Sequence, residues 1–275
     1  MSNPLVKVVL GLLLTANFGA PLVAVVTNRH LWEEPMALLV GNISLVCMLI
    51  GVNLFTVGAY DVLQLRAGGL CRALQYSGFG FGGGFKMAQL CVAAGQLAAI
   101  SRPLEHRSLM ARARRWVLAA TWLTWAAQVT FGVIAVSLGL PTAADRVGGY
   151  GNSTVGRSEC RWESSLAAVY AVLAEVQTLL FSLATVGTLV FTAAVGCRSK
   201  ARLTREVEEV GYRAAASEEN RQLVDNFSEF RKIVWVFTLT VPLDIITPML
   251  RISSLWYPTP TQRDPSSAAP FRLDL

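Results

Sequence analysis

Two long stretches of this chain contain no charged residue, and they constrain its fold more than any other feature. They are residues 36–58 and 116–140. Each exceeds the roughly 20 apolar residues that a helix needs to cross a hydrocarbon core about 30 Å thick. Only 15% of the chain is charged, whereas soluble domains carry roughly 25%. The sequence therefore predicts an integral membrane protein in contact with a lipid bilayer.

Further apolar stretches predict an all-α fold, a polytopic membrane helix bundle. We expect six spans, at about residues 5–27, 36–58, 73–97, 116–140, 164–196 and 233–254. Pro35 suits the first turn of the second helix, where its missing N–H group is not needed. Gly68-Gly69 predicts a turn before the third span. Five glycines between residues 78 and 84 predict that this span is locally irregular.

The segment 197–232 is polar, and two interpretations of it remain open. It is either a pair of helical extensions of the flanking spans, broken near Gly211, or a solvated charged loop. The tail 255–275 contains several prolines and no apolar run, so we expect it to be disordered.

The distribution of Lys and Arg predicts the orientation. The loops 28–35, 98–115 and 197–232 carry fourteen of these residues, and the alternate loops with the tail carry seven. Because the richer set of short loops faces the cytosol, we expect a multi-pass protein of the plasma membrane with its N-terminus outside the cell. The basic residues lie between apolar spans, which argues against nucleic acid as a partner.

This topology places Cys71 and Cys160 outside, in an oxidising compartment where a disulfide persists. Two free thiols are the alternative. The sequon at Asn152 lies in the same outer loop and predicts glycosylation there. No Cys-x-x-Cys pair occurs, and the two histidines, His30 and His106, lie outside the spans. We therefore expect no metal site, and the sequence indicates no other cofactor.

Several runs carry a family resemblance. The strongest is Gly-Gln-Leu-Ala-Ala-Ile-Ser-Arg-Pro-Leu at residues 95–104. It resembles the D-R-Y-V-A-I-C-R-P-L run that closes the third helix of class A (rhodopsin-like) G protein-coupled receptors. Asn17 and the run around Asn42 resemble landmarks of the first two spans. Trp122 and the interval between Cys71 and Gln96 fit the same family.

The resemblance implies a seven-span receptor-type fold with a disulfide between Cys71 and Cys160. It implies a cytosolic switch at Gly95, Gln96 and Leu97. The protein would sense an unknown extracellular ligand and signal through helix rearrangement. Its partners would be a heterotrimeric G protein or other receptors.

The resemblance also implies a ligand cavity enclosed by spans three, five and six. We single out an ionisable residue in each of these spans: Lys86, Glu175 and Asp244. We hypothesise that Lys86 pairs with Glu175 or Asp244 near the cavity floor, because buried charges in a membrane are costly and usually paired. The alternative is that Asp244 lies near the outer interface and that Lys86 is a tolerated substitution without a functional role.

The chain also departs from the family pattern. Gly95-Gln96 replaces the Asp-Arg pair of the family, and Cys47 occupies the position of the family's sodium-binding Asp. We expect no seventh helix after Pro258. These departures favour a rival hypothesis, a non-signalling decoy or assembly partner of receptors. The charges inside the spans would suit a second rival, a small six-span transporter. No catalytic triad, paired catalytic carboxylates or phosphate loop is recognisable, so we expect no enzyme and assign no catalytic residues.

Overall fold

The computed structural model describes residues 3–28, 30, 35–65, 68–102, 105–142, 160, 162–210, 245–246 and 249–250. Its helices are α1 (Pro4–Thr27), α2 (Pro35–Val62), α3 (Gly68–Ser101), α4 (His106–Ser137), α6 (Trp162–Ser165) and α7 (Ala168–Val210). The described residues form no strand beyond one isolated bridge between Thr142 and Ala167. The expected all-α fold is therefore confirmed for the described part of the chain.

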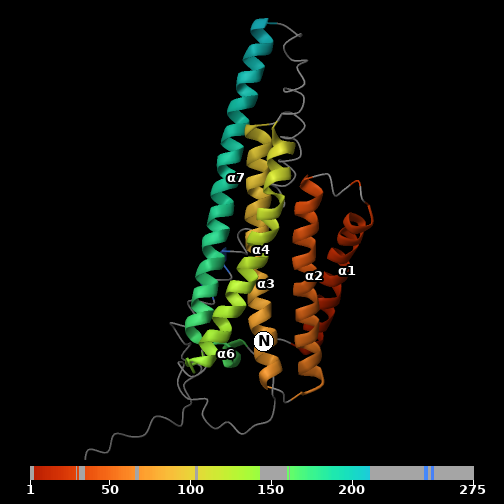
Figure 1. Cartoon of the computed structure of the whole chain (residues 1–275), viewed down its shortest axis with the longest axis vertical. Coiled ribbons are helices and arrows are strands. Elements are labelled where there is room, and N and C mark those ends of the chain that lie inside the picture. Colours follow the sequence, from red (N-terminus) through yellow and green to blue (C-terminus); the bar gives the residue numbers. More distant parts are fainter. Residues whose placement is uncertain are drawn as a thin grey trace, which may run out of the picture.

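The five long helices lie side by side, and α3 lies at the centre (Figure 1). It packs against α2, α4 and α7, whereas α1 packs against α2 at the edge of the bundle. The end of the bundle that holds Cys71 and Cys160 is called the disulfide end below; α6 lies there, at the bottom of Figure 1. The opposite end, where α3 ends and α4 begins, is called the α3–α4 end.

Four of these helices are long and apolar enough to cross a membrane: α1, α2, α4 and α7. The expectation of six spans is not met in the described residues. The predicted span at 73–97 is a helix, but α3 does not meet the same apolar criterion because it contains glycine, glutamine and Lys86. The predicted span at 233–254 lies outside the described residues, except for four positions near its end.

The polar composition of α3 follows from its central position. Its buried residues include Lys86, Gln89 and Gln96, and the helix packs against α2, α4 and α7. The prediction that its glycines make this span irregular is wrong, because the helix is continuous. A Cβ atom at Gly83 would lie 2.5 Å from Nε2 of Gln128, and one at Gly80 would lie 3.0 Å from the Trp125 ring. The glycines thus make room for side chains of α4.

Close backbone contact also joins α1 to α2. Asn3 caps the start of α1 by accepting the Leu5 N–H, and Pro4 follows at the first helical position. A Cβ atom at Gly11 would lie 2.5 Å from the backbone nitrogen of Phe55. Gly51 has a similarly close neighbour in Thr15. Small residues therefore allow the two backbones to touch, while most of the apolar surface of α1 faces outward.

Several helix ends differ from the predicted loops. α2 begins at Pro35, as predicted. Gly68 does not form a turn but begins α3, and the turn before it includes Gln64 at a φ of 50°. The predicted loop 98–115 is mostly helical, since α3 runs to Ser101 and α4 starts at His106. Arginine is a good helix former, so the helices continue past the apolar core.

The extension hypothesis for the polar segment after the fifth span is confirmed as far as Val210. α7 has 43 residues, which gives a length of about 65 Å, roughly twice the hydrocarbon core. Figure 1 shows it projecting beyond the other helices at the α3–α4 end. The predicted break at Gly211 and the disordered tail 255–275 lie outside the described residues.

Polar side chains also connect neighbouring helices inside the bundle. Nδ2 of Asn42 donates a hydrogen bond to Oγ1 of Thr121 at 2.9 Å, which links α2 to α4. Nε2 of Gln128 donates to Oε1 of Gln177 at 2.9 Å, which links α4 to α7. Such interhelical hydrogen bonds contribute about 0.6 kcal/mol each on average in membrane proteins. They fix the rotation of each helix more than they add stability.

Candidate functional site

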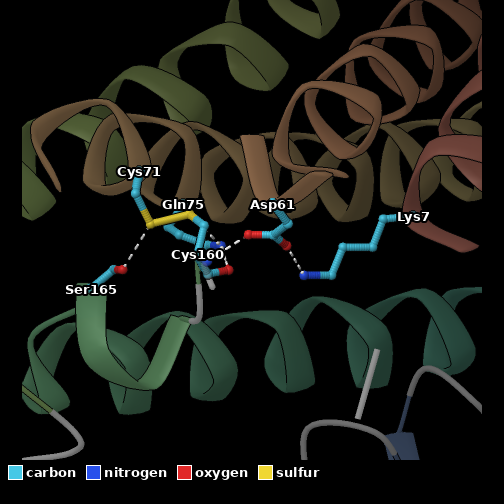
Figure 2. Close-up of a disulfide and its surroundings, with 6 residues drawn as sticks. All are labelled: Lys7, Asp61, Cys71, Gln75, Cys160 and Ser165. Atoms are coloured by element: carbon cyan, nitrogen blue, oxygen red, sulfur yellow. Dashed lines mark hydrogen bonds and ion pairs between the residues drawn. A yellow bond between two sulfur atoms is a disulfide. The ribbon is translucent and has the colours of Figure 1, made fainter. Parts of the chain in front are cut away.

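A disulfide joins Cys71 in the first turn of α3 to Cys160, as the resemblance implies. The two Cα atoms are 5.6 Å apart, and both residues are buried. Oγ of Ser165, in α6, lies 3.2 Å from Sγ of Cys71. The bridge therefore holds the segment before α7 against the start of α3 (Figure 2).

Asp61 lies beside this bridge and links three parts of the chain. Its Oδ2 atom is 2.6 Å from Nζ of Lys7 in α1. Its Oδ1 atom accepts the backbone N–H of Cys160 at 2.6 Å. Figure 2 shows the carboxylate between the two partners. Only 2% of the Asp61 side chain is exposed, against 16% for Lys7, so this is a largely buried, charge-assisted contact.

Gln75 also binds Cys160. From the second turn of α3, its Nε2 atom donates to the Cys160 carbonyl oxygen at 3.2 Å. Asp61 accepts the N–H of the same residue, so both backbone polar groups of Cys160 have protein partners. Buried backbone groups without partners are costly. The disulfide segment is thus bound covalently to α3 and by hydrogen bonds to α2 and α3.

An aromatic cluster lies next to this polar network. The rings of Tyr76 and Tyr170 meet edge to face, with centroids 4.7 Å apart. Phe79 contacts both Tyr170 and Trp162. The hydroxyl oxygen of Tyr76 accepts the N–H of Ala167 at 3.2 Å. This cluster packs α3 against α6 and the start of α7, immediately beyond the disulfide.

Lys86 and Glu175 are both buried, on the neighbouring helices α3 and α7. Nζ of Lys86 donates to Oε1 of Gln89, one turn along α3, at 3.1 Å. It also lies 5.2 Å from the centroid of the Phe85 ring. The predicted pairing of Lys86 with Glu175 stays a prediction. Asp244, the other predicted partner, lies outside the described residues.

The predicted switch residues lie at the α3–α4 end. Gly95 and Gln96 are buried and Leu97 is partly buried. A Cβ atom at Gly95 would lie 3.1 Å from the Leu39 side chain, so α2 approaches α3 closely here. Close packing between α2 and α3 therefore surrounds the predicted switch residues.

His106, the first residue of α4, lies against Gly95, one of the predicted switch residues. Burial lowers the pKa of His106 below its usual value, and a hydrogen bond with the backbone of Gly95 partly opposes that shift. Its Nε2 atom is buried without a hydrogen-bond partner. A proton added to that nitrogen would introduce a buried charge with no acceptor.

Sequence reasoning missed Lys7 and Asp61. One signal was available for each: Lys7 is a charged residue inside the predicted first span, and Asp61 is the only acidic residue between residues 59 and 72. The predicted glycosylation site Asn152 lies outside the described residues. Within the described ranges, no group of three His, Cys, Asp or Glu residues is placed to hold a metal ion.

Comparison with known proteins finds no family model that matches this chain, and no curated protein matches it.

Proposed function

We propose that this chain is a class A G protein-coupled receptor-like protein of the plasma membrane, which senses an extracellular ligand and signals through helix rearrangement. In this proposal the N-terminus and the disulfide end face outside. α3 crosses the bilayer together with the four apolar helices, and the described residues form part of a bundle of six spans of the seven-span receptor type.

One observation carries the proposal. The disulfide fastens the start of α3 to the segment that enters α7, and the two buried ionisable residues of the proposed ligand cavity lie on these same two helices. A ligand held near Lys86 and Glu175 would act on two helices joined firmly at one end. The two helices would then move relative to each other at the opposite end, where Gly95 and Gln96 lie.

The proposed orientation is tested first, in intact cells. An epitope tag at the N-terminus should bind antibody without permeabilisation. A tag inserted between α3 and α4, after Arg102, should bind only after permeabilisation. The opposite labelling pattern would place the proposed ligand cavity on the wrong side and would overturn the proposal.

Signalling is tested with purified protein in nanodiscs and a panel of heterotrimeric G proteins, with uptake of a non-hydrolysable GTP analogue as the measurement. We expect at least one G protein to exchange nucleotide faster than with empty nanodiscs, and we expect Lys86→Met to change that rate. Arg72→Gln, an exposed position outside the proposed cavity, is the matched control and should leave it unchanged. No response from any G protein would contradict signalling by this route.

The replacement of the Asp-Arg pair by Gly95-Gln96 favours a second candidate, a non-signalling decoy or assembly partner of receptors. It predicts that co-expression changes the surface level of a complete receptor, with no nucleotide exchange. A six-span transporter predicts instead a solute flux in sealed vesicles that Lys86→Met abolishes.

A further inference from the structure

We propose that the start of α4 binds the headgroup of an anionic phospholipid through Arg112 and Arg115, and that Trp116 beside them lies at the membrane interface. Arg112, Arg115 and Trp116 are spaced at i, i+3 and i+4, so they share one face of α4. All three are exposed, and Trp116 is 78% exposed. This surface goes beyond the proposed ligand cavity and does not depend on receptor activity.

Helix length places the three residues at the depth of the lipid headgroups. From Trp116 to its end at Ser137, α4 is about 33 Å long, which matches a hydrocarbon core of about 30 Å. Arg115 and Arg112 then lie about 1.5 and 6 Å beyond Trp116 along the helix axis. Tryptophan prefers the membrane interface, so the arginines reach the layer that contains the phosphate groups.

Acidic residues are scarce in α3 and α4, the two helices that meet at this end of the described chain. Glu105 is the only acidic residue between residues 62 and 144. Its carboxylate lies 3.3 Å from Nη1 of Arg102, so it is already paired. Among the described residues, Arg112 and Arg115 take part in no ion pair. Two arginines one turn apart match the geometry and charge of a phosphate.

The same face continues into lipid. Leu123, two turns beyond Trp116 on this side of α4, is 67% exposed. An acyl chain can therefore follow the apolar surface of the helix while its headgroup lies between the arginines. This continuity favours a phospholipid in the leaflet over free phosphate as the occupant.

The test measures lipid retention by the purified full chain in micelles that contain equal amounts of phosphatidylserine and phosphatidylcholine. Native mass spectrometry gives the ratio of the two lipids bound. We expect the wild type to prefer phosphatidylserine, and Arg112→Gln with Arg115→Gln to lower the ratio roughly fivefold for each arginine removed. Higher ionic strength should weaken the preference.

Three comparisons complete the design. The variant Arg112→Lys with Arg115→Lys retains both charges and should keep most of the preference. Arg72→Gln, an exposed site at the disulfide end, should keep all of it. Equal preference in the wild type and the double glutamine variant would overturn the proposal. Displacement of the lipid by inorganic phosphate, but not by sodium chloride at the same ionic strength, would also overturn it, because the site would then bind phosphate alone.

Discussion

We predict that Asp61→Asn destabilises the protein by about 2 kcal/mol, through loss of the ion pair with Lys7. Asparagine keeps a carbonyl oxygen that can accept the Cys160 N–H, so that hydrogen bond survives. Breaking a buried pair costs about 3–5 kcal/mol when the remaining charge stays buried. The Lys7 side chain is 16% exposed and lies one turn from the start of α1. Its ammonium group can therefore extend to the interface, which reduces the cost.

The other variants of this pair should differ in a defined order. Asp61→Ala also leaves the Cys160 N–H without an acceptor, which adds about 1–3 kcal/mol. Lys7→Met leaves a carboxylate that is 2% exposed, so it should cost more than Asp61→Asn. The double variant Lys7→Met with Asp61→Asn contains no lone charge. Its cost should be smaller than the sum of the two single costs by roughly 2 kcal/mol.

Thermal unfolding in detergent, followed by intrinsic tryptophan fluorescence, measures these differences. Each kcal/mol lowers the midpoint by roughly 2–4 °C for a chain of this size. Glu105→Gln is the matched control, because it breaks an ion pair whose side chains are 65% and 62% exposed. Such a pair contributes at most about 1 kcal/mol. Strict additivity in the double variant would refute the coupling that we infer.

Three further predictions use the same assay. Cys71→Ser with Cys160→Ser opens a bridge that spans 89 positions of sequence and should cost about 2–5 kcal/mol, whereas serine at the exposed thiol of Cys197 should cost almost nothing. Gly11→Ala should destabilise by about 1–3 kcal/mol, because its Cβ would lie 2.5 Å from the backbone nitrogen of Phe55. Gly19→Ala, in the same helix, meets nothing within 4 Å and should stabilise by about 1 kcal/mol. The lowered pKa of His106 means that the unfolded chain binds its proton at a higher pH than the folded chain does. The free energy of unfolding therefore does not depend on His106 protonation above the unfolded pKa of about 6.5, and it falls as the pH drops from that value toward the lower folded pKa. His106→Asn should flatten the decline in the unfolding midpoint between pH 7.5 and pH 5.5.

The sequence predicted the helices well, because span length follows directly from the thickness of the hydrocarbon core. It did not predict the contact between Lys7 and Asp61, which are 54 positions apart and carry no local pattern that pairs them. The start of α4 at His106 was also missed. Hydropathy reports where the apolar core ends, but a helix rich in arginine continues beyond it.

Among the described long helices, only α3 lacks a stretch as apolar as a membrane span, although the sequence predicted a span there. Hydropathy assumes that a spanning helix faces lipid, yet α3 faces α2, α4 and α7. Its polar residues lie at three levels: the half-buried Gln75 beside the disulfide, the buried Lys86 and Gln89 in the middle, and the buried Gln96 at the α3–α4 end. In the proposed receptor, the one continuous helix that carries all three levels would transmit a displacement at the disulfide end to Gln96. An assay of signalling must therefore record both ends of α3, since motion at one end without the other would show that the helix is not the element that couples them.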